Sequence, residues 1–340
     1  MLFRSDLNAW TTKEETCLYA ALGKAYLDRA LELFADVAYN SVFPPVEIEK
    51  EKQVVFDEMD SYKDTPSEQI LDDFEGLLFK DHPLGGNILG TRKSVGKFSQ
   101  AGLLTFFNRF YRPDRMVLAI AGDVDERRVI KGVEKYFGLY SSGDALATRV
   151  GFENITPPFN EVRKRKGYQA HTVLGGFAPS SIDQDRVKAA FLINYLGGPA
   201  MTSRLNLLIR ERHGLTYNIE AGIQPLTDTG YYYIYFGTEA GLLEKTTNLV
   251  QIELKRICDE KMGSLVLQQA KRQQVGMLLL SSESPSNRIN ALGRQWLHFK
   301  NVETTDQIIS SINEITQQDV LDMANRMFSP SNIYSISFHP

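Results

Sequence analysis

Hydrophobic and polar positions first follow the pattern of a hairpin. Residues 7–12 and 16–21 are rich in β-branched and aromatic side chains, and the polar segment Lys13-Glu14-Glu15 separates them. Two such runs joined by a short polar turn are typical of paired strands. The start of the chain is therefore predicted to form an antiparallel β-hairpin.

The spacing of apolar residues then changes to that of helices. The first helical stripe consists of Leu27, Ala30, Leu31, Phe34, Val37 and Ala38. Steps of three and four residues place these side chains on one helix face. Further helices are predicted at 46–63, 66–79, 99–110 and 125–137, with Asp123 or Asp125 as the cap of the last one.

An uninterrupted apolar run at 115–121 predicts a buried strand. Residues 139–160 contain Ser, Gly and Pro in a pattern typical of a linker, so we place a domain boundary there, with domains at 1–145 and 146–340. In the second domain the pattern predicts strands at 168–177, 215–224, 230–238 and 333–338, and helices at 183–196, 203–211 and 241–259.

Two short similarities suggest an internal repeat. The Pro113 turn is echoed at Pro330, and Glu15-Thr16 is echoed at Asp228-Thr229, so the two pairs are separated by nearly the same length of chain. The fold class is therefore predicted to be α+β, with two homologous α/β sandwich units, although echoes this short also arise by chance. A repeat of this length would place the opening strand and helix of the first unit ahead of residue 1, so this unit is expected to be incomplete.

Composition excludes several classes of protein. Thirty-eight Lys and Arg against 42 Asp and Glu give a net charge of −4, which provides no positive field for nucleic acid or an anionic membrane surface. No apolar stretch approaches the ~20 residues of a membrane helix. Cys17 and Cys258 are too few for a disulfide framework or a thiolate metal site, and neither is expected to carry chemistry. Nucleophile-elbow, P-loop and dinucleotide-binding motifs are absent, and no two of the five histidines are four residues apart.

Two constellations remain as candidates for chemistry. Glu51 and Glu58 are two helical turns apart, so both carboxylates lie on one face, where they could bind a metal or form a solvated acidic stripe. Arg210 and Tyr217 flank a predicted turn, where both could donate hydrogen bonds to a carbonyl or oxyanion. The alternative for this pair is a surface arginine and a half-buried strand tyrosine.

Several motifs occur in the order found in one known family. They are Leu7-Asn8-Ala9-Trp10-Thr11, the segment Glu49 to Glu58, His82-Pro83-Leu84-Gly85, Leu196-Gly197-Gly198, Ser203-Arg204-Leu205, Arg210-Glu211 and Gly214-Leu215-Thr216-Tyr217. With these motifs the chain resembles the insulinase/pitrilysin family of zinc metallopeptidases, which includes the mitochondrial processing peptidase subunits. The resemblance is closest to two-domain bacterial members that work as paired chains, and it implies the metallohydrolase fold of the processing peptidases.

The resemblance also implies roles for the candidate residues. Glu58 matches the third zinc ligand, and Glu51 matches a carboxylate near it. Asn8 and Ala9 match the edge strand on which an extended peptide adds as a further strand. Arg210 and Tyr217 match the pair that holds the substrate carbonyl. The implied reaction is metal-assisted hydrolysis of the peptide bond.

One part of the family pattern is missing. The His-x-x-Glu-His motif, which supplies two zinc ligands and the general base, lies about 80 residues before the glutamate matched by Glu58. It is not in these 340 residues. A catalytic zinc site needs three protein ligands, so this chain is expected to bind zinc poorly or not at all and to be inactive alone.

Three hypotheses follow for function. The first is a zinc endopeptidase or oligopeptidase acting on extended peptides, of which this sequence is a truncated record. The second is a non-catalytic peptide-binding or partner subunit of a two-chain peptidase, and the third is an unrelated role for the same fold. A homodimer or a heterodimer with a related subunit is expected. Neither nucleic acid nor membrane is expected as a partner, and the cytoplasm is the default location unless a leader precedes residue 1.

Overall fold

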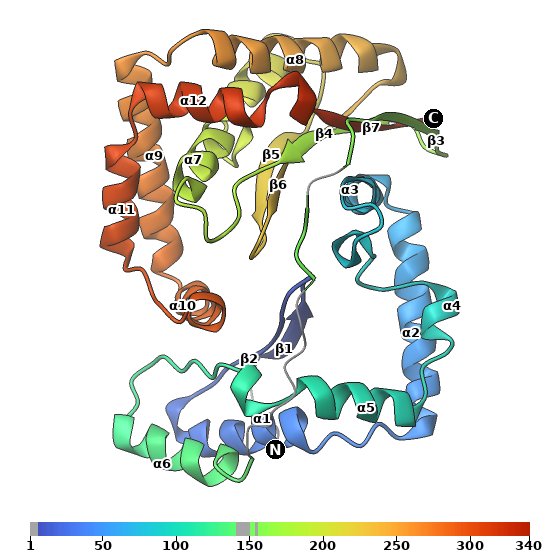
Figure 1. Ribbon diagram of the computed structural model, residues 1–340, viewed down its shortest axis with the longest axis vertical. Coiled ribbons are helices and arrows are strands. Elements are labelled where there is room, and N and C mark those ends of the chain that lie inside the picture. Colours follow the sequence, from blue (N-terminus) through green and yellow to red (C-terminus); the bar gives the residue numbers. More distant parts are fainter. Residues whose placement is uncertain (1–5, 141–149, 154–155) are drawn as a thin grey trace. The chain divides into compact units, whose positions relative to one another are not determined.

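The computed structural model describes residues 6–140, 150–153 and 156–340. The chain forms two compact units, and neither is continuous in sequence (Figure 1). Unit 1 consists of the described residues of Met1–Met59, Ile88–Val150 and Leu280–Glu303. Unit 2 consists of those of Asp60–Asn87, Gly151–Leu279 and Thr304–Pro340. The boundary predicted near residue 145 separates two homologous domains and not two compact units, so it stays a prediction.

Unit 1 begins with the predicted hairpin. Strand β1 (Asp6–Thr11) pairs antiparallel with β2 (Thr16–Ala21), and Thr11 lies opposite Thr16. The turn closes where the Thr12 amide donates to the Glu15 carbonyl at 2.8 Å. The prediction of a hairpin at 7–21 is therefore confirmed.

Helices make up most of the rest of unit 1. They are α1 (Leu27–Tyr39), the larger part of α2 (Pro45–Lys63), α4 (Arg92–Val95), α5 (Gln100–Phe110), α6 (Glu126–Phe137) and α10 (Pro285–Phe299). Helices α1 and α6 pack closely because Gly132 leaves room for Leu31: an added Cβ would lie 2.6 Å from the Leu31 Cδ1 atom. Asp125 caps α6 by accepting the Arg128 amide at 2.8 Å, as predicted, whereas Asp123 pairs with Lys24.

The predicted strand at 115–121 is wrong. The structure has a short 3-10 helix at Pro113–Arg115, and residues 116–121 form no regular element. A strand needs a neighbour that accepts its backbone hydrogen bonds. In the described part of unit 1 the only strands are those of the hairpin, which pair with each other. The apolar run therefore has no sheet to join.

Unit 2 is built on a five-stranded sheet. Its strands are β3 (Asn160–Lys164), β4 (Ala170–Phe177), β5 (Ile219–Pro225), β6 (Gly230–Thr238) and β7 (Tyr334–His339), in the order β3-β7-β4-β6-β5. Strands β3 and β7 are parallel, and the other neighbours are antiparallel. Four of the five were predicted, and β3 has no counterpart among the predicted elements.

Helices cover both faces of this sheet (Figure 1). On one face, α7 (Arg186–Gly197), α8 (Leu243–Asp259) and α12 (Gln317–Met327) enclose a core that contains Leu192, Ile234, Val250 and Ala324. On the other face, α3 (Pro66–Leu78) packs on β4 and β7 through Phe74 and Leu78. The approach of α3 depends on Gly175, where an added Cβ would lie 2.6 Å from the Phe74 ring.

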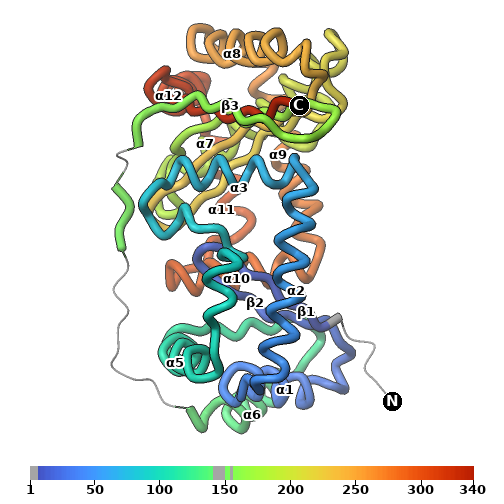
Figure 2. The backbone as a smooth tube through the Cα atoms, turned by 90° about the vertical axis from the view of Figure 1, so that its right-hand side faces the viewer, coloured from blue at the N-terminus to red at the C-terminus, as the bar shows by residue number. Residues whose placement is uncertain are grey.

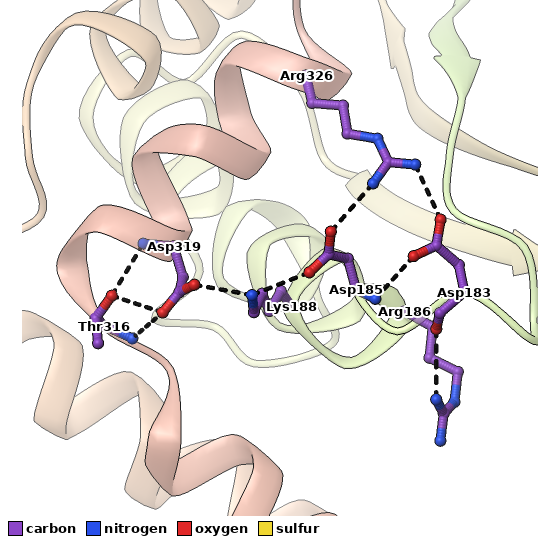
Figure 3. Close-up of polar contacts among 7 residues, drawn as sticks. All are labelled: Asp183, Asp185, Arg186, Lys188, Thr316, Asp319 and Arg326. Atoms are coloured by element: carbon purple, nitrogen blue, oxygen red, sulfur yellow. Dashed lines mark hydrogen bonds and ion pairs between the residues drawn. The ribbon is translucent and has the colours of Figure 1, made fainter.

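A chain of ion pairs fastens α12 to the start of α7 (Figure 3). Lys188 lies 2.8 Å from the Asp319 carboxylate and 2.9 Å from that of Asp185. Arg326 continues the chain, 3.2 Å from Asp185 and 2.9 Å from Asp183. Asp319 also accepts hydrogen bonds from the amide and the hydroxyl of Thr316, which caps α12. The same carboxylate therefore serves both the cap and the ion pair.

The order of elements repeats along the chain. The run from β1 through α1, α2, α3, α4 and α5 corresponds to the run from β5 through α8, α9 (Ser264–Ser282), α10, α11 (Thr305–Glu314) and α12. The offset between the first residues of corresponding elements is nearly constant, as it is for Asp6 and Ile219 or for Gln100 and Gln317. Helices α2 and α9 are both 19 residues long, and α5 and α12 are both 11 residues long. This agreement supports an internal duplication.

The two units exchange one helix of this repeat. Helix α3 belongs to unit 2, although the hairpin of its own repeat is in unit 1. Its counterpart α10 belongs to unit 1, although most of the second repeat is in unit 2. Each unit is therefore completed by a helix from the other repeat (Figure 2). Among the described helices, none combines the length and apolar character that crossing a membrane requires.

Candidate functional site

Helix α2 presents both candidate carboxylates to solvent. Ile48, Lys52 and Met59 form the buried side of this helix, and the Lys52 ammonium lies 2.7 Å from Glu49. Glu51 and Glu58 each precede one of the buried residues and are exposed. The two side chains are thus free to bind a partner from solution on the flank of a well-anchored helix.

The described residues do not fit a catalytic zinc ion. They contain no group of three or more His, Cys, Asp and Glu side chains arranged to hold a metal. Glu58 is one exposed carboxylate, whereas a catalytic zinc needs three protein ligands and an open position. The role of Glu58 as a ligand therefore stays a prediction, as does that of Glu51.

Strand β1 offers an open edge. Within the described chain its sheet has two strands, so β1 is paired on the side of β2 alone. The Thr12 amide points to Glu15, and amides alternate in direction along a strand. The amides of Asn8 and Trp10 therefore face β2, and the amide of Ala9 faces away from it.

The outward amide of Ala9 has a local acceptor. It donates to Oδ1 of the preceding Asn8 at 2.8 Å, and both residues are exposed. A single side-chain rotation of Asn8 would release this amide for an incoming carbonyl group. The geometry suits addition of an extended chain at Asn8 and Ala9, the two residues for which the family resemblance implies this role.

The hairpin turn also contains a buried charge that the sequence analysis did not single out. The Glu15 side chain is only 4% exposed, with Arg294 2.5 Å from one carboxylate oxygen and His298 2.9 Å from the other. Both partners lie on α10, which belongs to the second repeat and is far from the hairpin in sequence. The spacing of four between Arg294 and His298 was visible in the sequence, but nothing there paired that helix face with Glu15.

Cys17, next to this turn, is poorly suited to chemistry. Burial and the nearby Glu15 carboxylate raise the pKa of its thiol, and Arg294 opposes them. A raised pKa keeps the thiol protonated near neutral pH, and the thiolate is the reactive form. The expectation that neither cysteine carries chemistry stays a prediction.

Arg210 and Tyr217 lie in unit 2, at the end of an unusual helix. Residues Asn206–Arg212 form a π-helix, where a helix was predicted at 203–211. Gly214, with a φ of 62°, then reverses the chain. Arg210 is exposed, and Tyr217 is 89% exposed. The alternative of a half-buried strand tyrosine is therefore wrong, because β5 begins two residues after Tyr217.

The backbone that carries these two side chains is firmly held. Thr216, between Gly214 and Tyr217, is buried, and its hydroxyl donates to the Asn218 carbonyl at 2.7 Å. The Leu215 amide donates to the Ile209 carbonyl at 3.0 Å. Two exposed donors on a fixed support can bind a carbonyl oxygen. The candidate residues of α2 and β1 belong to unit 1, and this pair belongs to unit 2.

A half-buried histidine in the unit 2 sheet is not among the candidates. His171 on β4 lies 2.9 Å from the Tyr235 hydroxyl on β6. Burial lowers the pKa of this imidazole, and burial together with the Glu220 carboxylate raises the pKa of Tyr235 to about 12. Both groups are therefore neutral near pH 7, and the pair serves as a hydrogen bond between neighbouring strands.

Comparisons with known proteins agree on one family. The family model described as insulinase (peptidase family M16) matches residues 4–92, and the one described as peptidase M16 inactive domain matches residues 97–274. The uncharacterized zinc protease YmxG of Bacillus subtilis is 32% identical over 95% of this chain and 78% of its own length. An uncharacterized zinc protease of Rickettsia bellii is 30% identical over the same shares.

Solved structures agree on the fold. A peptidase M16 inactive domain from Pseudomonas fluorescens matches with a TM-score of 0.90 and 21% identity, covering 99% of this chain and 81% of that one. A protease from Helicobacter pylori matches with a TM-score of 0.89 and 18% identity, covering 99% of this chain and 82% of that one. The mixed α+β architecture predicted from the sequence is thus confirmed.

Proposed function

Since the chain belongs to peptidase family M16, the insulinase family, we propose that it binds extended peptides by strand addition at β1 and takes part in their hydrolysis. The observation that carries this proposal is the open edge of β1, where the Ala9 amide faces away from β2 and donates to the side chain of Asn8. Backbone hydrogen bonds along such an edge provide affinity with little demand on peptide side chains.

The relatives are named zinc proteases, so we propose hydrolysis as the reaction to which this binding leads. Zinc would supply an activated water molecule there. Glu58 is proposed as a single ligand to such a zinc ion, with Glu51 as a neighbouring carboxylate, and the described residues of this chain do not supply the other two protein ligands. Arg210 and Tyr217 are proposed to donate hydrogen bonds to the substrate carbonyl, which suits their exposure on a fixed backbone.

A second candidate function is a peptide-binding subunit without hydrolytic activity of its own. The available metal ligands favour this second candidate, because the described residues offer Glu58 and no group of three ligands. In this version Arg210 and Tyr217 act on a peptide held at the zinc site of a partner chain. Both candidates share the strand-addition step, so this step is tested first.

The test uses a fluorescently labelled extended peptide of eight to ten residues and two methylated versions of it. In one version every second backbone amide is N-methylated, and in the other the alternate set is methylated. Strand addition directs alternate amides toward β1, so one version loses affinity and the other keeps it. Fluorescence anisotropy gives the three dissociation constants. Equal affinity for the two methylated peptides would contradict strand addition.

Hydrolysis is then tested by mass spectrometry of the unlabelled peptide after incubation with the chain and Zn²⁺. Cleavage that is lost in Glu58→Gln supports the first candidate and overturns the expectation that this chain is inactive alone. Binding without cleavage agrees with the second candidate, and also with the first one for a chain that contributes a single zinc ligand. A Glu47→Gln variant, changed on the same helix at an exposed carboxylate that pairs with Lys50, is the matched control.

A further inference from the structure

Three side chains of α10 form a stripe that faces the hairpin. Asn290, Arg294 and His298 follow one another at steps of four residues, so they lie on one side of the helix. Each has a contact with the hairpin: Asn290 with Cys17 (3.9 Å), and the other two with Glu15. The α10 helix therefore meets the hairpin through polar side chains.

The stripe neutralises a carboxylate that would otherwise be costly to bury. Glu15 is 4% exposed, His298 is 16% exposed, and Arg294 is 49% exposed. A buried carboxylate without a partner loses its hydration with no compensation. The contacts at 2.5 and 2.9 Å provide that compensation. They fix the turn of the hairpin against the helix.

The same stripe reaches strand β1. The Arg294 guanidinium lies 5.9 Å from the centre of the Trp10 ring. Trp10 is opposite Cys17 in the register, and side chains alternate between the faces of a strand. Asn8, two residues before Trp10, is therefore on the face that α10 supports. Its side chain is the one that accepts the outward amide of Ala9.

A two-stranded hairpin is marginally stable by itself in water. The conformation of the β1 edge therefore depends on what supports the hairpin, and α10 supplies charged contacts at the turn and on one face. We propose that Arg294 and His298 are positioning residues: acting through Glu15 and Trp10, they hold β1 in the conformation that accepts a peptide strand. This inference rests on the proposed function and deepens it by naming residues outside the family motifs.

The first test compares Arg294→Met with Arg288→Met, which removes an exposed arginine from the same helix. Arg294→Met removes the guanidinium that contacts Glu15 and lies over Trp10. We expect the dissociation constant for the unmethylated peptide to rise about tenfold, with less than a twofold change for the control. His298→Gln keeps a hydrogen-bond donor on a side chain of different shape, so a smaller rise of about threefold is expected.

Hydrogen exchange provides a readout that needs no peptide. Amides of β2 and the inward amides of β1 are expected to exchange at least tenfold faster in Arg294→Met and at wild-type rates in Arg288→Met. Glu15→Gln added to Arg294→Met removes the negative charge that Arg294 balanced and is expected to restore part of both the protection and the affinity. That rescue distinguishes action through Glu15 from a general loss of packing.

The outcomes separate the two proposals. If the wild-type chain binds no peptide but hairpin exchange still responds to Arg294→Met, the proposed function fails and the support of β1 by α10 stands. If the wild-type chain binds peptide and Arg294→Met matches the control in affinity and exchange, the positioning role is overturned. Should Arg294→Met fail to fold, Arg294→Lys, which keeps the charge without the planar group, is measured in its place.

Discussion

The ion pair between Asp319 and Lys188 should make the stability of unit 2 depend on pH. Hydrogen bonds from Lys188 and from the hydroxyl and amide of Thr316 lower the pKa of the Asp319 carboxyl from 3.8 to about 2 (Figure 3). One pKa unit corresponds to about 1.4 kcal/mol, so the ionised carboxylate contributes at most about 2.5 kcal/mol. The Asp319 and Lys188 side chains are 27% and 35% exposed, and solvent screening reduces this to about 1–1.5 kcal/mol.

The sign follows from the direction of the shift. A carboxyl group with a lowered pKa in the folded state stabilises the fold above its unfolded value of about 3.8. This contribution is lost as the pH falls from about 4 to about 2. Asp319→Asn keeps an acceptor for the Thr316 amide and removes the charge. We therefore expect it to cost about 1–1.5 kcal/mol at pH 7 and progressively less below about pH 4.

Urea unfolding followed by far-UV circular dichroism at several pH values measures this difference. Both tryptophans, Trp10 and Trp296, are in unit 1, so their fluorescence reports that unit separately. The control is Asp322→Asn, at an exposed carboxylate of α12 that accepts a hydrogen bond from Gln318. A difference between wild type and Asp319→Asn that stays constant from pH 7 to pH 3 would refute the assignment to the ion pair.

Three further predictions concern stability and ligand binding. Arg204→Met should destabilise unit 2 by about 3 kcal/mol in urea unfolding, because the buried Glu253 carboxylate loses the guanidinium that contacts it at 2.5 and 2.8 Å. Adding Glu253→Gln should recover part of this stability, and no recovery would contradict a charge effect. Gly175→Ala should lower the free energy of unfolding by about 2–3 kcal/mol, since the new Cβ would lie 2.3 Å from the Tyr232 carbonyl oxygen. The control Gly241→Ala, whose new Cβ would have nothing within 4 Å, should be nearly neutral, and similar melting temperatures for the two variants would argue against a steric cause. Peptide affinity measured by anisotropy should not change on adding EDTA, because strand addition uses backbone hydrogen bonds, and a loss of affinity would show that a metal takes part in binding.

Local patterns in the sequence predicted those elements whose structure is decided locally. The hairpin, the helix at 45–63 and the Asp125 cap depend on residues within a few positions of one another. The prediction of a strand at 115–121 was wrong for the opposite reason, since a strand depends on a neighbour that is distant in the sequence. The π-helix at 206–212 is a change in hydrogen-bond register that apolar spacing does not distinguish from an α-helix.

The candidate site was likewise predictable from the sequence only in part. Spacing placed Glu51 and Glu58 on one helix face and placed Arg210 and Tyr217 beside a turn, but it left their roles open. The family resemblance implied a role for each of the four residues. The structure adds what neither contains: the direction of the Ala9 amide and the pairing of Glu15 with α10. Both depend on contacts between segments whose proximity a single sequence does not encode in any local pattern.

The exchanged helices have a consequence for synthesis on the ribosome. The hairpin of unit 1 ends at residue 21, and the helix that covers one of its faces ends at residue 299. At a translation rate of roughly 5–20 residues per second, the ribosome synthesises that helix about 15–55 seconds after the hairpin. Strand β7, on which α3 packs, is also synthesised late, because it ends at residue 339. Neither unit can therefore fold to completion before the other is largely translated, and the nascent chain has to be kept from aggregating until both repeats have emerged.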